Sequence, residues 1–159
     1  MKSRAFATTP MSPRTKQQLR LWLRLLRTTR GIEAELRGRL RLQFNTTMPR
    51  FDVMAALARK PAGLTMTALS RTLIVSNGNI TGIVDRLVAD GLVVRLSSAQ
   101  DRRTTFVRLT RQGERQFADM AAVHERWIGE LFGPLDARAA AEMTHLLDRL
   151  APQAHLSET

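Results

Sequence analysis

The sequence contains no cysteine, and this absence removes several classes of protein at once. Disulfide-stabilised folds, thiolate zinc sites, cysteine nucleophiles and thiol-based redox sensors all need that side chain. Long apolar runs are also missing. The basic N-terminal segment has no apolar stretch of signal-peptide length, and no window approaches the ~20 apolar residues that cross a bilayer. We therefore expect a protein of a reducing, cytoplasmic compartment that is neither secreted nor inserted in a membrane.

Acidic residues are scarce relative to basic ones, 14 against 25, which gives a net charge of +11. The excess is uneven: residues 1–50 hold 12 basic and 2 acidic side chains, 51–115 hold 10 and 5, and 116–159 hold 3 and 7. Such a balance indicates a polyanionic partner that binds outside the C-terminal third. The alternative is an arginine-rich, solvated face that binds nothing in particular.

Helical patterns dominate the first half of the 159 residues. Ser12-Pro13 is a helix-start signal, and apolar residues recur at helical spacing from 14 to 44. Gly31 and Gly38 lie inside this helix, so we expect a bend or a close packing contact there. Pro49 opens a second, shorter helix that residues 60–63 end.

Two short helices follow, at about 67–73 and 76–90, with only residues 74–75 between them. This spacing is typical of a helix-turn-helix. The second helix has an apolar stripe of the kind that packs inward, followed by Gly91 as a stop. The stripe consists of Ile80, Ile83, Val84, Leu87 and Val88.

The period then changes to two, over 92–96 and again over 105–109, which predicts a β-hairpin with a polar tip at 97–103. Thr110 and Asp136 are caps of two further helices that end near 132 and 150. The predicted fold class is mainly α with a small β-hairpin: a winged helix-turn-helix flanked by N- and C-terminal helices.

Catalysis has little support in this sequence. His124, His145 and His155 have no partner at metal-ligand or general-base spacing, and structural roles are favoured for them. The segment 78–82 is not a nucleotide loop, because it follows no strand and no lysine follows it. We expect no catalytic residue, no metal and no cofactor.

The predicted helix 76–90 is suited to a DNA major groove. Asn pairs with adenine edges, Arg with guanine, and Thr with an edge or a thymine methyl, while glycine lets the backbone approach closely. The alternative is that Asn77-Gly78 forms a plain turn and the helix starts later. The predicted contacts on these two helices are Thr67, Ser76, Asn77, Gly78, Asn79, Thr81 and Arg86.

The hairpin tip holds a second group of predicted DNA contacts. Arg102 and Arg103 fit a narrow minor groove, whose negative potential attracts guanidinium groups, with Asp101 positioning one of them. An ordinary solvated turn is the alternative for this tip, and its place directly after a helix-turn-helix favours the DNA contact.

These segments together resemble the winged helix of the MarR family of bacterial transcriptional regulators. The motifs are LTMTALS at 64–70, VDRLVADGLV at 84–93, DRR at 101–103 and VRLTRQG at 107–113. The resemblance implies a DNA-binding domain over 47–113, with 76–90 as the recognition helix and 95–105 as the wing. It also implies a homodimer formed through the helices of 14–46 and 114–150, between a flexible arm (1–13) and tail (151–159). Redox-sensing members use cysteine, so that activity is excluded here.

Two segments, 46–54 and 73–81, are similar to regulators of hydroxycinnamate and related aromatic-acid breakdown, some of which respond to the coenzyme A thioester. The resemblance implies an effector site between the dimerisation helices and the winged helix. Its candidate lining is Trp22, Phe44, Met48, Arg50, Phe51, Met54 and Trp127, although core packing is the favoured role for each methionine and aromatic residue taken singly. The phosphates of a thioester have candidate partners in Arg20, Arg24, Arg27, Arg37, Arg39 and Arg41.

Two other functions compete with a ligand-responsive repressor. An architectural protein would bind nucleic acid through its basic N-terminal third without reading sequence, and a helical interaction module would dock a basic partner on its acidic C-terminal third. A polar helix face followed by a basic hairpin favours the regulator.

Overall fold

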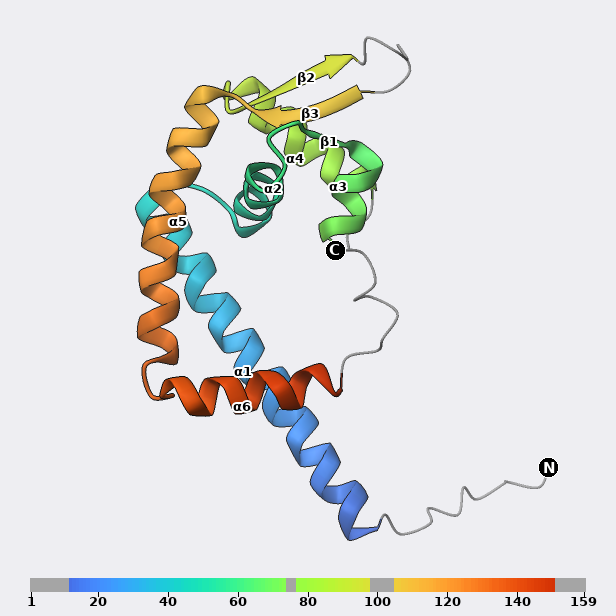
Figure 1. The fold of residues 1–159 in the computed structure, drawn as a ribbon, viewed down its shortest axis with the longest axis vertical. Coiled ribbons are helices and arrows are strands. Elements are labelled where there is room, and N and C mark those ends of the chain that lie inside the picture. The colour runs from blue at the N-terminus through green and yellow to red at the C-terminus, as the bar shows by residue number, and fades with distance from the viewer. Residues whose placement is uncertain (1–11, 74–76, 98–104, 151–159) are drawn as a thin grey trace, which may run out of the picture. The chain divides into compact units, whose positions relative to one another are not determined.

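A computed structural model describes residues 12–73, 77–97 and 105–150, without the side chains of residues 77 and 78 (Figure 1). The chain divides into two compact units, one up to Met48 and one from Pro49 onward.

The first unit is dominated by one long helix, α1 (Pro13–Phe44). Ser12 caps it as predicted, since its side-chain oxygen accepts a hydrogen bond from the N–H of Thr15 at 3.1 Å. At the two glycines a bend or a close packing contact was expected, and the described part of this chain makes no close contact there. A Cβ added at Gly31 or Gly38 would meet no described atom within 4 Å. The helix ends at Asn45, whose φ of 47° places it in the left-handed region.

The second unit begins with three helices, α2 (Met48–Ala58), α3 (Met66–Leu73) and α4 (Asn77–Ala89). The first starts one residue before the predicted Pro49, and the other two form the predicted helix-turn-helix. The start of α3 is set by Thr65, whose side-chain oxygen accepts a hydrogen bond from the N–H of Ala68 at 3.1 Å. The residues of the turn, 74–76, lie outside the described part.

Three antiparallel strands form a sheet in the order β1-β3-β2. The predicted hairpin is present as β2 (Val93–Ser97) and β3 (Thr105–Leu109), which pair from Val93 with Leu109 to Ser97 with Thr105. The sequence did not predict β1 (Leu64–Thr65), a two-residue strand that pairs with β3. Two residues are too short to show alternation, so only the folded sheet defines this strand.

Two helices complete the unit, α5 (Arg111–Phe132) and α6 (Ala137–Asp148), and Figure 1 shows α5 running from the end of β3 toward α6. Thr110 and Asp136 cap them as predicted. The mainly helical fold class with a small antiparallel sheet is therefore confirmed. None of the helices described has both the length and the apolar character needed to cross a membrane.

The buried side chains described in this unit come from helices α2 to α5 and from the sheet, and none comes from α6. They position α4 against α3 and β2, which both contact it. The largest fully buried ones are Val53, Met54, Leu57, Leu69, Ile80, Val84, Leu87, Val107 and Met120.

Candidate nucleic-acid interface

Helix α4 has one face fixed in the core. Ile80, Val84 and Leu87 are 0% exposed, while Ile83 and Val88 are half-buried. The inward stripe predicted from the sequence is confirmed. Because this stripe sets the rotation of the helix, it also decides which side chains face outward.

The opposite face of α4 is exposed and polar. Asn79, Thr81 and Arg86 are all exposed, and a Cβ added at Gly82 would meet no described atom within 4 Å. The helix backbone is thus open to close approach at that point. Thr67 on α3 is also exposed. Of the other predicted contacts, Ser76 and the side chains of Asn77 and Gly78 lie outside the described part.

An ion pair ties α4 to the sheet, and the sequence did not predict it. Arg95 of β2 donates to Asp85 of α4 with 2.6 Å between Nη1 and Oδ1. Both side chains are partly exposed, so we expect a small contribution to stability. Its consequence is geometric, because it links the orientation of α4 to the strand that leads into the hairpin tip.

The C-terminal end of α4 is held by backbone geometry and by a second ion pair. Gly91 adopts the left-handed φ of 71°, as its predicted role as a stop requires. The N–H of Asp90 donates to the carbonyl of Arg86 at 3.0 Å, and the carboxylate of Asp90 accepts from Nη2 of Arg50 on α2 at 2.5 Å. The last turn of α4 is therefore connected to the start of α2.

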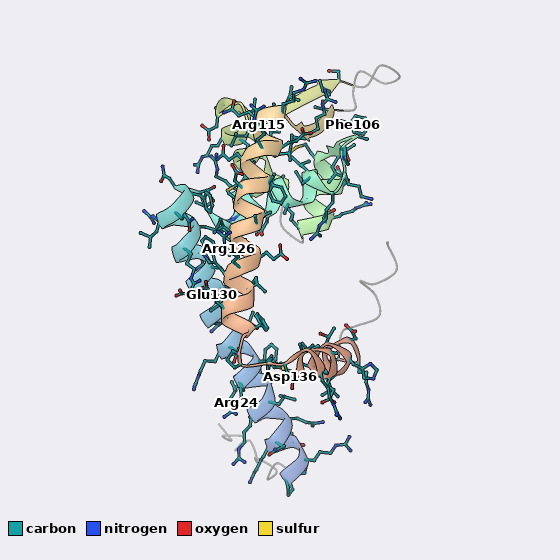
Figure 2. All side chains as sticks on the ribbon, turned by 60° about the vertical axis from the view of Figure 1, so that its left-hand side comes forward. Arg24, Phe106, Arg115, Arg126, Glu130 and Asp136 are labelled. Carbon is teal, nitrogen blue, oxygen red and sulfur yellow. The ribbon has the colours of Figure 1, made fainter. Side chains whose placement is uncertain are left out.

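The described part of the hairpin ends where Ser97 pairs with Thr105. Next to this pair Leu96 faces Phe106 across the strands, and Figure 2 shows the Phe106 side chain near the outer end of the sheet. Residues 98–104 lie outside the described part. The roles of Asp101, Arg102 and Arg103 at the wing therefore stay predictions.

A cluster of rings joins α2 to α5 inside the second unit. Phe51 stacks on His124 with 4.7 Å between ring centroids and contacts Phe117 at 5.6 Å. His124 meets Trp127 edge-on at 6.4 Å. Two of the predicted effector residues, Phe51 and Trp127, are thus brought together through His124, for which only a structural role was expected. Its spacing of three from Trp127 on one helix is the signal that could have found it.

The remaining predicted effector residues differ in their surroundings. Arg50 is half-buried beside Phe51, and Met54 is almost fully buried in the core. Trp22, Phe44 and Met48 belong to the first unit, where Trp22 is 56% exposed and the other two are half-buried. Within the second unit, Arg50 and Phe51 are neighbours in the first turn of α2, where Arg50 pairs with Asp90 and Phe51 packs on the rings of α5.

The arginines of α1 form a mostly exposed set in the first unit. Arg20, Arg24 and Arg27 line a hollow of about 850 Å³ together with glutamines and leucines of the same helix. Figure 2 shows Arg24 at this position on the helix. Arg37 and Arg41 are exposed, whereas Arg39 donates to Glu35 at 2.8 Å and is partly neutralised. The first three therefore lie together on one stretch of α1, and a role for any of the six arginines in phosphate binding stays a prediction.

The ring cluster changes the titration of His124. Burial lowers the pKa of His124 below its usual value of about 6.5, and the Asp52 carboxylate opposes that shift. Because the unfolded chain then binds the proton more readily than the folded one, the contribution of this group to stability is present above pH ~6.5 and is lost as the pH falls below it.

Between about pH 7.5 and 5 the unfolding free energy of the wild type should fall. We expect a smaller fall in the variant His124→Phe, which keeps a ring against Phe51 but cannot bind the proton. Urea unfolding at a series of pH values measures this. The control His145→Gln removes an exposed imidazole from α6 and shows whether the loss of a histidine outside the ring cluster has the same effect. Identical pH profiles for the wild type and His124→Phe would contradict the assignment.

The residues described hold no group of three or more side chains arranged as metal ligands. What they do hold is a helix-turn-helix whose second helix is anchored on one face and polar on the other, followed by a hairpin. Fold and site together define a winged helix-turn-helix DNA-binding protein.

Comparison with known proteins agrees with this class. The MarR family matches residues 44–104. A solved MarR family transcriptional regulator from Silicibacter pomeroyi is 34% identical, with a TM-score of 0.75 over 88% of this chain and 96% of that one. The chain belongs to the MarR family and is a DNA-binding transcriptional regulator, not an enzyme. A mutant of MarR from Escherichia coli, solved in complex with operator DNA, is 27% identical with a TM-score of 0.75 over 89% of this chain and 100% of that one.

Two further relatives have names that describe opposite effects on transcription, one an activator and one a repressor. The transcriptional activatory protein BadR of Rhodopseudomonas palustris is 30% identical over 75% of this chain and 65% of its own length. The homoprotocatechuate degradative operon repressor of Escherichia coli is 26% identical over 65% of this chain and 70% of its own length.

Proposed function

We propose that this chain is a repressor that binds a pseudo-palindromic operator as a homodimer and is released by a small aromatic acid or its coenzyme A thioester. The observation that carries the DNA-reading part is the exposed face of α4. Asn79, Thr81 and Arg86 project outward from a helix whose other face is locked in the core. These side chains suit base edges in a major groove, with Thr67, Ser76, Asn77 and Gly78 nearby in sequence.

The homodimer is supported by apolar side chains that each unit leaves exposed. Exposed leucines and other large apolar residues are concentrated near the ends of the chain, and such concentrations mark protein contact surfaces. In α1 they are Leu19, Leu21, Trp22 and Leu23, and around α6 they are Phe132, Met143, Leu146, Leu147 and Leu150. We propose helices 14–46 and 114–150 as the dimerisation elements, on either side of a DNA-binding domain over 47–113.

The aromatic effector is supported by the side chains on α2 and α5. Arg50 supplies a cation from the same turn of α2 as Phe51, and Phe51 stacks on His124, which meets Trp127 edge-on. One of the relatives is named for the repression of a homoprotocatechuate degradative operon, that is, of the breakdown of an aromatic acid. For a thioester, Arg20, Arg24 and Arg27 of α1 would hold phosphates. A bound polyanion would also weaken the positive potential that DNA needs.

The operator proposal is tested by selecting binding sites from random duplexes. We expect a two-fold symmetric consensus whose half-site centres lie about 10 base pairs apart, because paired recognition helices enter successive major grooves. Sedimentation should give a dimer of the 17.9 kDa chain. A pool that keeps binding without any consensus would instead show an architectural protein, and an asymmetric consensus bound by a monomer would contradict the homodimer.

A further inference from the structure

The Arg50–Asp90 ion pair joins the proposed effector site to the recognition helix. Arg50 lies in the first turn of α2, directly before Phe51 of the ring cluster. Asp90 follows the last residue of α4, and its N–H donates to the carbonyl of Arg86. One side chain contact therefore spans forty residues of sequence and connects a candidate anion site with a candidate DNA contact.

The guanidinium of Arg50 is only partly satisfied. Nη2 donates to Asp90, whereas Nε is buried with no hydrogen-bond partner in the part of the chain described. A carboxylate prefers two parallel bonds from a guanidinium edge. Asp90 uses one donor of such an edge, Nη2, and leaves the adjacent donor, Nε, buried and without a hydrogen bond to the residues described. A second carboxylate that bonded to both donors would be bound more strongly, and to reach them it would have to displace Asp90 from Nη2 and turn the guanidinium so that Nε is uncovered.

The two partners differ in how easily they can separate. The Asp90 side chain is 51% exposed, but that of Arg50 is only 20% exposed. A released Asp90 returns to water at small cost, while Arg50 stays inside the protein and needs another anion. The pair therefore suits an exchange in which Arg50 stays in place and a ligand carboxylate replaces that of Asp90.

We infer that Asp90 competes with the carboxylate of the effector for Arg50, so that effector binding releases the last turn of the recognition helix. The inference rests on the proposed aromatic-acid effector. Helix α4 keeps its second tie, the Asp85–Arg95 pair, so the change is confined to the turn that carries Arg86 and Asp90. If operator DNA binds better when Asp90 is paired with Arg50, the effector weakens operator binding by some factor. By linkage, the operator then weakens effector binding by that same factor.

The test measures binding of 4-hydroxycinnamate by calorimetry, with its uncharged methyl ester for comparison. Asp90→Asn removes the competing charge, and we expect 4-hydroxycinnamate to bind about tenfold tighter than to the wild type, with no change for the ester. Arg50→Gln should bind the acid at least about tenfold more weakly. Asp85→Asn is the matched control, because it breaks the other tie of α4 and leaves Arg50 engaged, so acid binding should not change.

Operator binding supplies a second readout with the selected duplex. Saturating 4-hydroxycinnamate should weaken operator binding by the wild type and have a smaller effect on Asp90→Asn, which starts without the pair. If Asp90→Asn bound the acid with the same affinity as the wild type, the inference would be overturned, while the proposed effector would still stand. Equal tightening in Asp85→Asn would also overturn it, since general loosening of α4 would then be the cause. Absence of binding by both the wild type and Asp90→Asn would overturn the effector proposal together with the inference.

Discussion

Replacing Gly113 with alanine is expected to destabilise the second unit by about 3 kcal/mol or more, a loss of about 6–12 °C in Tm. A Cβ at this position would lie 2.0 Å from the carbonyl oxygen of Leu92. The clash is with backbone, so no rotation of a flexible side chain can relieve it, and the start of α5 or of β2 has to move.

The surrounding hydrogen bonds make that movement costly. The hydroxyl of Thr110 accepts from the N–H of Gly113 at 3.0 Å and donates to the carbonyl of Gly91 at 2.7 Å. The N–H of Thr110 donates to the carbonyl of Leu92 at 3.0 Å. Displacement at Gly113 therefore reaches Gly91, which ends the recognition helix, and we expect weaker operator binding as well.

Gly129→Ala is the matched control on the same helix. An added Cβ at Gly129 meets no described atom within 4 Å, and alanine is favoured over glycine inside a helix by about 1 kcal/mol, so this variant should be as stable as the wild type or more so. Thermal unfolding followed by circular dichroism compares the two. A Tm for Gly113→Ala equal to that of Gly129→Ala would show that the contact with Leu92 relaxes without cost.

Local signals predicted most of the fold because their causes lie within a few residues. Ser12, Thr110 and Asp136 each cap a helix through a bond to the third residue beyond, which a short window contains. The period of Ile80, Val84 and Leu87 predicted both α4 and its rotation. Strand β1 was missed because its pairing with β3 spans about forty residues and leaves no pattern in two positions.

The candidate site was predicted less completely, because several of its contacts join residues that are far apart in the sequence. Outward-facing residues of α4 follow from its inward stripe. The partners of Asp85 and Asp90 do not, because Arg95 and Arg50 reach them only in the folded unit. The stacking of His124 on Phe51 likewise joins two helices far apart in sequence. Which aromatic residues share a site depends on such packing, and residue type alone does not decide it.

Operator binding is expected to weaken about 10⁴-fold between 50 and 200 mM salt, the largest effect predicted for this protein. If the dimer neutralises about eight phosphates, the slope of log affinity against log salt is near −7, because each contact releases condensed counterions. The net charge of +11, concentrated before residue 116, provides the cations. Titration of a labelled operator duplex at a series of salt concentrations gives this slope.

Two sets of variants divide this effect between phosphate contacts and base reading. Arg86→Ala should lower operator affinity at least tenfold and binding to random duplex much less, since a base contact is lost at each half-site. The double variant Arg102→Ala, Arg103→Ala removes four cations per dimer from the proposed wings, so the slope should become shallower by up to about 3.5 on both duplexes. Arg138→Ala is the control for loss of a charge outside the proposed DNA-binding domain, because Arg138 is exposed on α6 and pairs with nearby Glu142. Since α6 is also a proposed dimerisation helix, sedimentation has to show that this control is still a dimer.

The direction of these changes separates the two modes of recognition. A base-reading residue alters the ratio between operator and random duplex at constant slope, whereas a phosphate-binding residue alters the slope and leaves the ratio nearly constant. If Arg86→Ala lowered both affinities equally, the exposed face of α4 would bind the backbone and not the bases. If the double variant behaved like Arg138→Ala, the hairpin tip would lie outside the DNA interface.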